Sequence, residues 1–131
     1  MIRRFMRGGA SSKDSQVPNK VDEARAVFYP VAKVEKIKPG EMRYVEVGED
    51  DEPVCLINFE GDFYALNDCC THEDASLSDG EIVGDEIECP LHGGAFEIRT
   101  GLPANFPVVV PARMYPVRVV DGIVEIGVEE K

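Results

Sequence analysis

The sequence predicts an all-β fold, an antiparallel sandwich or small barrel, and three observations support this prediction. Short apolar runs recur along the 131 residues, and turns rich in glycine and proline separate them. No segment has the long apolar periodicity of a convincing helix. The dipeptide Asp121-Gly122, placed between two alternating segments, is a strong signal for a type I′ hairpin. The length suits one domain with a buried core.

The expected strands follow one another between residues 29 and 128. They are residues 29–37, 43–47, 54–59, 63–67, 82–83, 86–88, 95–98, 115–120 and 123–128. Turn signals at 60–62 and 84–85 predict two further hairpins. Residues 21–27 are expected to form one helical turn, and the proline-rich segment 100–111 is expected to be a long loop.

The charge is unevenly distributed. The net charge is −11, but residues 1–25 carry six basic and three acidic side chains, which leaves −14 on residues 26–131. We expect residues 1–25 to be a disordered basic N-terminal arm and residues 26–131 to be the domain. An acidic body argues against nucleic acid. It favours a basic protein partner, although acidic surfaces also serve solubility.

Targeting signals are missing from the sequence pattern. No apolar run approaches the roughly 18 residues of a membrane helix. Arg3, Arg4 and Arg7 begin the chain, but the apolar stretch of a secretory signal does not follow them. We therefore expect a cytoplasmic protein that does not bind a membrane.

Two cysteine–histidine pairs are the main functional signal. Cys70-Thr71-His72 and Cys89-Pro90-Leu91-His92 are separated by sixteen residues, and the chain has only these two histidines. Together they supply four ligands to one metal site. Their order differs from that of zinc fingers, and it suits two unlike metal positions, one held by thiolates and one by imidazoles. Without an export signal, metal ligation explains the cysteines better than disulfides do.

The motif resembles the Rieske 2Fe–2S motif, C-x-H followed by C-x2-H. The resemblance extends through CTHEDASLSDG (70–80), ECPLHG (88–93), FEIRTG (96–101) and YPVRV (115–119), and it covers roughly residues 28–128. The chain looks like the small Rieske-type ferredoxins that serve bacterial ring-hydroxylating dioxygenases. This resemblance implies a Rieske-like antiparallel β-sandwich, with a small cluster-binding subdomain formed by two loops at about residues 68–110.

The resemblance also implies the ligands of one 2Fe–2S cluster. Cys70 and Cys89 would bind the buried iron, and His72 and His92 would bind the outer iron near the surface. Spacing alone leaves Cys69 as an alternative, because Cys69 and His72 also form C-x2-H. The resemblance favours Cys70, so Cys69 is expected to be an ordinary buried thiol. Cys55, in an apolar strand, is expected in the core.

Residues around the cluster receive weaker assignments. Pro107 would lie in the loop that covers the cluster. The apolar shield would comprise Leu77, Leu91 and Phe96. Glu73 and Asp74 would form part of a docking rim, or would simply be solvated.

Departures from the high-potential Rieske pattern predict a low reduction potential. Ala75 and Leu91 stand where those proteins carry a disulfide, and Gly94 and Phe96 stand where they carry hydroxyl donors. Without these donors the reduced cluster is less stabilised. We therefore expect a reduction potential of about −150 mV, the lower end of the Rieske range.

The resemblance implies a one-electron carrier. It would accept an electron from a flavoprotein reductase and deliver it to a terminal oxygenase. It would not be the enzyme itself, because no histidine remains for a mononuclear iron site. Two alternatives remain open. One is a small electron-transfer subunit of a larger enzyme, such as an assimilatory nitrite reductase. The other is a structural zinc module.

Overall fold

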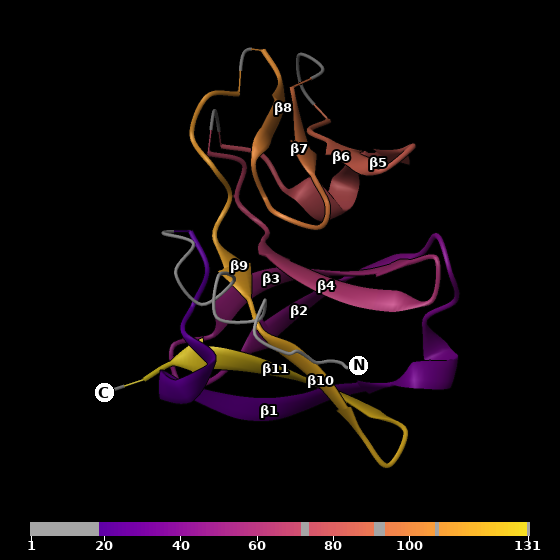
Figure 1. Cartoon of the computed structure of the whole chain (residues 1–131), viewed down its shortest axis with the longest axis vertical. Helices are drawn as coiled ribbons and strands as arrows, with labels where there is room; N and C mark the ends of the chain where they lie inside the picture. Colours follow the sequence, from indigo (N-terminus) through magenta and orange to yellow (C-terminus); the bar gives the residue numbers. More distant parts are fainter. Residues whose placement is uncertain (1–18, 72–73, 91–93, 107, 131) are drawn as a thin grey trace, which may run out of the picture.

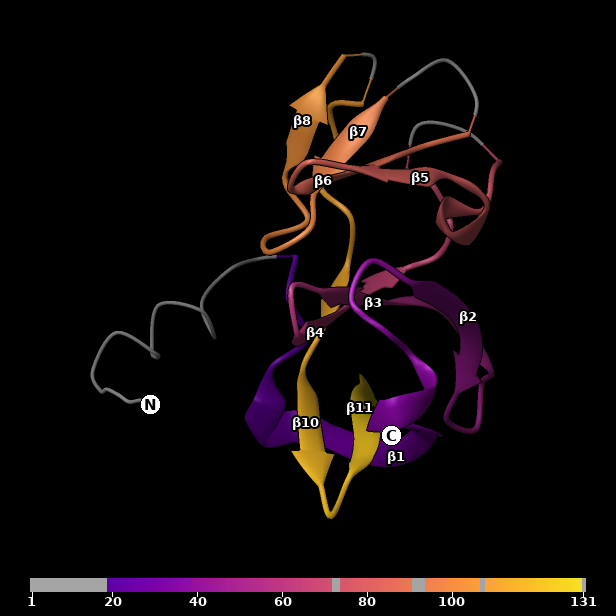
Figure 2. The ribbon, with the colours of Figure 1, turned by 90° about the vertical axis from the view of Figure 1, so that its right-hand side faces the viewer.

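The computed structural model describes residues 19–71, 74–90, 94–106 and 108–130, which form three antiparallel sheets (Figure 1). One sheet has the strand order β1-β11-β10, the second β2-β3-β4-β9, and the third β5-β6-β7-β8. Figure 2 shows the sheets in three levels, with the second between the other two. The prediction of an all-β antiparallel fold is confirmed for the described chain.

The first two sheets pack face to face and form the base of the molecule. The first contains β1 (Ala26–Lys33), β11 (Ile123–Glu129) and β10 (Val117–Val120). The second contains β2 (Met42–Val47), β3 (Glu52–Phe59), β4 (Asp62–Asn67) and β9 (Met114–Tyr115). Val54 and Leu56 of β3 share one buried apolar cluster with Val124 and Ile126 of β11. Burial of these side chains between two sheets stabilises the base.

β3 is buried on both faces, which explains its nearly continuous apolar sequence. Successive side chains of a strand point to opposite sides. Val54 and Leu56 face the first sheet, whereas Cys55, Ile57 and Phe59 belong to a second apolar cluster on the other side. The third sheet covers that second side, so the sheet that contains β3 is the central layer of the molecule.

The third sheet is made of four short strands, and the chain enters and leaves it once. Its strands are β5 (Glu81–Val83), β6 (Glu86–Glu88), β7 (Ala95–Glu97) and β8 (Pro103–Asn105). The chain leaves β4 at Asn67 and returns to the second sheet at Met114. This excursion includes residues 68–110, the part for which cluster binding stays a prediction. The subdomain is thus a small sheet from which the two motif loops extend.

The predicted hairpins are present where the turn residues indicated them. At the β10–β11 turn, Asp121 and Gly122 have φ values of 51° and 78°. Glu60 and Gly61, at the β3–β4 turn, have φ values of 56° and 97°. Both pairs thus occupy the left-handed region that type I′ turns require.

Several element boundaries differ from the prediction. β1 begins at Ala26 and ends at Lys33, and a 3-10 turn, η2 (Val34–Lys36), follows it. The expected strand 115–120 is divided at Pro116, which has no N–H to donate. On either side of Pro116, β9 pairs with β4 and β10 pairs with β11, in different sheets. β8 lies within the segment expected to be a loop.

The predicted arm boundary at residue 25 lies too far along the chain. The Asn19 side chain donates hydrogen bonds of 2.8 Å and 2.9 Å to the carbonyls of Thr100 and Ala112. Val21 is buried, and its N–H donates to the Met114 carbonyl at 2.9 Å. Residues 19–25, including the 3-10 turn η1 (Glu23–Arg25), therefore belong to the folded unit. The expected disorder of residues 1–18 concerns residues outside the described ranges.

The helices of the described chain are 3-10 turns of three residues each, the third being η3 (Leu77–Asp79). None of them could span a membrane.

Candidate functional site

The two motif cysteines are buried in the same apolar cluster. Cys70 is 5% exposed and Cys89 is 3% exposed, and both pack in the core between β3 and the third sheet. Each comes from a different loop of the small sheet. His72 and His92 lie outside the described residues, so the structure brings together the two sulfur donors of the predicted set.

Each motif cysteine donates a backbone hydrogen bond across its own loop. The Cys70 N–H donates to the Ala75 carbonyl at 2.9 Å, and the Cys89 N–H donates to the Gly94 carbonyl at 2.7 Å. Antiparallel pairs precede these bonds, Cys69 with Ser76 in the first loop and Glu88 with Ala95 in the second. These cross-strand bonds fix the backbone at the base of each loop, in the first loop through an isolated bridge and in the second through the β6–β7 ladder, and so set the direction of each cysteine side chain.

A third segment lies beside the first loop. The Thr71 hydroxyl donates a 2.7 Å hydrogen bond to the Val110 carbonyl. Val108 is buried in the same core as the cysteines, whereas Phe106 is 81% and Val109 71% exposed. This segment is the one expected to cover the site. Pro107, for which that role was predicted, lies outside the described residues.

The predicted apolar surroundings are present where the structure describes them. Leu77 and Phe96 are fully buried and pack in the same cluster as Cys70 and Cys89. Ala75 packs against that cluster. Leu91, the third expected member, and Glu73, of the expected docking rim, are outside the described ranges. Asp74 is exposed to solvent.

The remaining two cysteines have opposite environments. Cys55 is fully buried, as predicted, and burial raises the pKa of its thiol to about 12. Cys69 is exposed, so its expected burial is wrong. The reason is the local ladder: neighbouring residues of an extended chain point to opposite faces, and Cys70 points inward. The same geometry favours Cys70 over Cys69 as the ligand.

A hydrogen-bonded chain connects the first loop to the base. Asn67 accepts a 3.0 Å hydrogen bond from the Cys69 N–H and donates one of 2.9 Å to the Tyr115 hydroxyl. Tyr115 in turn donates to Glu52 at 2.6 Å. Burial, followed by the hydrogen bond to Glu52, raises the pKa of Tyr115. These hydrogen bonds could not be predicted from the sequence, because residues 52, 67 and 115 are far apart in it and follow no recognised motif.

The described donors fit the sulfur side of an iron–sulfur centre. Paired thiolates in apolar surroundings are soft ligands shielded from water, which suits iron–sulfur clusters. Among the described residues, no group of three or more potential metal ligands comes together. The candidate site is therefore defined by the buried cysteine pair at the two hairpin ends.

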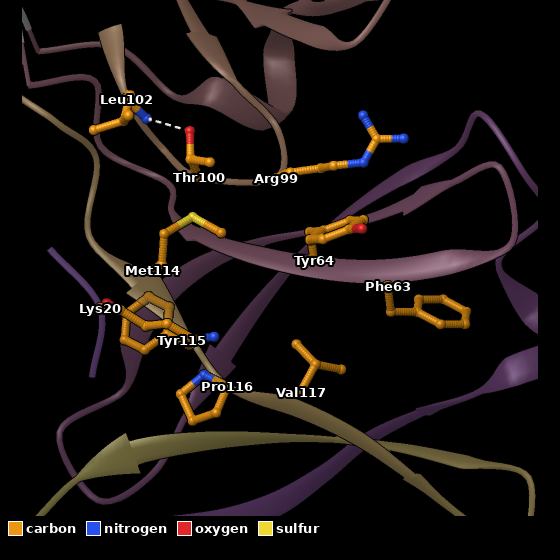
Figure 3. Close-up of a pocket in the computed structure, with 10 residues that line it drawn as sticks. All are labelled: Lys20, Phe63, Tyr64, Arg99, Thr100, Leu102, Met114, Tyr115, Pro116 and Val117. Atoms are coloured by element: carbon orange, nitrogen blue, oxygen red, sulfur yellow. Dashed lines mark hydrogen bonds between the residues drawn. The ribbon is translucent and has the colours of Figure 1, made fainter. Parts of the chain in front are cut away.

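A cavity of about 470 Å³ lies elsewhere, where the third sheet meets β4, β9 and β10 (Figure 3). Its described lining includes Met114 and Tyr64 but neither Cys70 nor Cys89. Arg99, at its edge, is 3.8 Å from a Glu60 oxygen and lies 4.7 Å over the Phe59 ring. The cavity is thus separate from the candidate site.

Comparisons with known proteins agree with this geometry. Residues 27–116 match the family model described as the Rieske [2Fe-2S] domain. The chain is 42% identical over 106 residues to ferredoxin CarAc of Metapseudomonas resinovorans, an alignment covering 80% of this chain and 97% of that one.

Solved structures give the same result. A complex of reduced oxygenase and oxidised ferredoxin in carbazole 1,9a-dioxygenase contains a chain that is 40% identical, with a TM-score of 0.74. That match covers 80% of this chain and 96% of the other. A putative NADH-dependent nitrite reductase small subunit from Mycobacterium tuberculosis is 20% identical, with a TM-score of 0.72 and coverage of 81% and 98%. At that identity the likeness concerns the fold alone.

Proposed function

Since this chain belongs to the Rieske [2Fe-2S] family, we propose that it works as the ferredoxin component of a ring-hydroxylating oxygenase system. It is an electron carrier, and the 2Fe–2S cluster of the family supplies its one-electron chemistry when bound. The observation that carries the proposal is the buried pair Cys70 and Cys89 at two hairpin ends. The chain around this pair matches almost the whole length of ferredoxin CarAc.

We infer that Cys70 and Cys89 are the sulfur ligands, and that His72 and His92 are the nitrogen ligands. The cysteine assignment is supported by burial in one apolar cluster and by the ladder bonds that orient both residues. The histidine assignment is supported by their positions in the motif, two residues after Cys70 and three after Cys89. The low potential expected from Gly94 and Phe96 stays a prediction.

We propose a terminal oxygenase as the electron acceptor and a flavoprotein reductase as the donor. A related ferredoxin occurs in a complex with the oxygenase of carbazole 1,9a-dioxygenase. In this chain, one segment beside the first loop exposes the apolar side chains of Phe106, Val109 and Val110. The hydrogen bond from Thr71 to the Val110 carbonyl connects this segment to the loop. Exposed apolar residues beside the site suit a transient protein partner.

The two alternative functions are less well supported. The nitrite reductase subunit shares only the fold at 20% identity, whereas ferredoxin CarAc is 42% identical over 97% of its length. Membership of the Rieske family disfavours a structural zinc module. Like its ferredoxin relatives, the chain is an electron-transfer component and not the oxygenase.

A cytoplasmic location is part of the proposal. Cys55, Cys69 and Cys70 are not in disulfides, and reduced thiols are typical of proteins that stay in reducing compartments. Separation of cell fractions, followed by immunodetection of the full chain, tests this location. Recovery from the periplasm or the membrane would contradict it.

The partner proposal is tested by electron transfer to a purified ring-hydroxylating oxygenase. A Val109→Asp variant places an unpaired charge in the proposed interface. We expect its concentration for half-maximal transfer to rise about tenfold, which corresponds to about 1.4 kcal/mol. Val119→Asp is the matched control, because Val119 is 51% exposed on β10, in the sheet at the opposite end of the molecule (Figure 1).

The control should transfer electrons like the unmodified protein, and both variants should keep its absorption spectrum. Equal transfer by Val109→Asp and Val119→Asp would contradict docking through this surface. Failure of the unmodified protein to reduce any oxygenase of the class, while a reductase still reduces it, would contradict the assignment of the acceptor.

A further inference from the structure

Asp68 is a buried carboxylate to which the electron-transfer function assigns no role. It is 4% exposed, and it is the one charged side chain among the described residues that is buried. It lies two residues before Cys70, in the segment that leads from β4 into the first motif loop. Burying a carboxylate costs free energy unless hydrogen bonds compensate, so its partners need to be identified.

The partners of Asp68 lie on the far side of the loop. Its carboxylate accepts a hydrogen bond from the Ser76 hydroxyl and another, of 2.8 Å, from the Ser78 N–H. The Ser76 and Ser78 hydroxyl oxygens are 2.9 Å apart and form a third hydrogen bond. The side chain thus connects the beginning of the loop, residue 68, to its end, residues 76–78.

The main chain of Asp68 reinforces this connection. Its N–H donates to the Pro53 carbonyl in β3 at 2.9 Å, and its carbonyl accepts from the Leu77 N–H at 2.7 Å. Asp68 therefore joins the central strand of the molecule to the turn that ends the loop.

The carboxylate also completes the 3-10 turn η3. The residue before this turn, Ser76, makes no capping hydrogen bond with its own side chain. Asp68 supplies the missing acceptor, because it binds the Ser78 N–H in the first turn. Leu77, held in this turn, is fully buried against the cluster that contains Cys70 and Cys89.

We propose that Asp68 is a positioning residue for the metal centre: its carboxylate closes the loop that carries Cys70, and its negative charge lowers the reduction potential. The charge effect follows from Coulomb's law, because a fixed negative charge opposes the addition of an electron nearby. A buried charge is screened by salt and water much less than an exposed one. The inference rests on the proposed electron-transfer function, since it requires a redox centre at Cys70.

Four substitutions in the full, cluster-loaded chain separate the two effects. Asp68→Asn removes the charge but keeps an oxygen for the Ser78 N–H and an amide for the Ser76 hydroxyl. Asp68→Ala removes the charge and both hydrogen bonds. Ser76→Ala keeps the charge and removes one hydrogen bond. Asp79→Asn is the matched control, because it removes the same charge from an exposed residue of η3.

For the charge, the measurement is a redox titration. We expect Asp68→Asn to keep the iron and sulfide content and to raise the ratio of reduced to oxidised cluster at least threefold at a fixed potential. A tenfold change would correspond to about 59 mV for a one-electron couple. Asp79→Asn should change the ratio less than Asp68→Asn does. Equal ratios in Asp68→Asn and the unmodified protein would overturn the charge effect.

For positioning, the measurement is hydrogen exchange of peptides within residues 68–80, together with the rate of iron loss to a chelator. Both rates should rise in Ser76→Ala, rise further in Asp68→Ala, and stay unchanged in Asp79→Asn. Asp68→Asn should restore rates near those of the unmodified protein. Unchanged rates in Asp68→Ala would overturn the positioning role.

Two further outcomes keep the inference separate from the proposed function. If Asp68→Asn did not load the cluster, exchange in Ser76→Ala would decide the positioning role, because this variant retains the carboxylate. If the unmodified chain bound zinc without sulfide, the proposed function would fail and the charge effect would fail with it. The exchange rates of the four variants would still support or overturn loop closure by Asp68.

Discussion

The Thr71 hydroxyl donates a 2.7 Å hydrogen bond to the Val110 carbonyl, 39 residues further along the chain. This bond joins the loop that carries Cys70 to the segment with exposed Phe106 and Val109. The proposed docking surface and the proposed metal loop are therefore connected through one side chain. A partner that binds the apolar segment would therefore contact residues that are hydrogen-bonded to the proposed metal loop.

Replacement of Thr71 by valine tests this connection. Thr71→Val keeps the shape of the side chain and removes the hydroxyl. Because Thr71 is exposed, we expect the free energy of unfolding to fall by only about 0.5 kcal/mol, the lower end for a hydrogen bond. Loss of iron to a chelator should nevertheless be faster. Thr71→Ser, which retains the donor, should release iron like the unmodified protein; equal rates for all three proteins would contradict the connection.

The cysteine assignments predict a clear difference between neighbours. Cys70→Ser and Cys89→Ser should abolish the cluster, because each removes a buried thiolate. Cys69→Ser should retain it, because Cys69 points to solvent. Iron and acid-labile sulfide analysis measures the result. Cys55→Ala controls for loss of a buried thiol, and we expect it to lower stability but keep the cluster. Loss of the cluster in Cys69→Ser, with retention in Cys70→Ser, would reverse the assignment.

The Tyr115 hydroxyl predicts a stability difference between two tyrosines. Tyr115→Phe removes the link between Asn67 and the Glu52 carboxylate, and we expect the free energy of unfolding to fall by about 1.5 kcal/mol. Tyr44→Phe is the matched control, because Tyr44 donates a 2.8 Å hydrogen bond to Glu46 at an exposed position. Solvent replaces that bond, so no measurable change is expected. Urea unfolding compares the two variants, and equal losses would contradict a special role for the buried link.

Alkaline pH should destabilise the protein through Cys55 and Tyr115. Folding raises both pKa values, that of Cys55 to about 12 from 9.0, and that of Tyr115 above its ordinary 10.0. Above about pH 9 the unfolded chain loses protons that the folded protein keeps, so stability falls as pH rises. Urea unfolding at a series of pH values measures the slope. Tyr115→Phe and Cys55→Ala should each flatten it between about pH 9 and pH 12, and parallel slopes in all three proteins would refute this origin.

The parts of the fold that were predicted correctly depend on residues close in sequence. Asp121-Gly122 and Glu60-Gly61 specify their hairpins locally, because both positions of each turn need positive φ. The nearly continuous apolar run of β3 likewise indicated a buried strand, because it too lies in consecutive residues. Pro116 could have indicated that the strand 115–120 divides, but the exchange of sheets at this point depends on partners in β4 and β11.

The candidate site could be predicted as far as its motif extends. Cys70 and Cys89 are buried together, as the motif implied, and Leu77 and Phe96 pack in the same cluster. The exposure of Cys69 follows from the ladder, which the sequence does not reveal. Asp68 escaped notice because its partners, Ser76 and Ser78, follow it by eight and ten residues at no recognised spacing.

The most direct test of the central claim is an EPR spectrum of the dithionite-reduced protein, recorded together with its iron and sulfide content. We expect two irons and two sulfides per chain and a rhombic signal whose average g value lies below that of the free electron. A colourless protein that contains zinc, no sulfide and no EPR signal after reduction would contradict it.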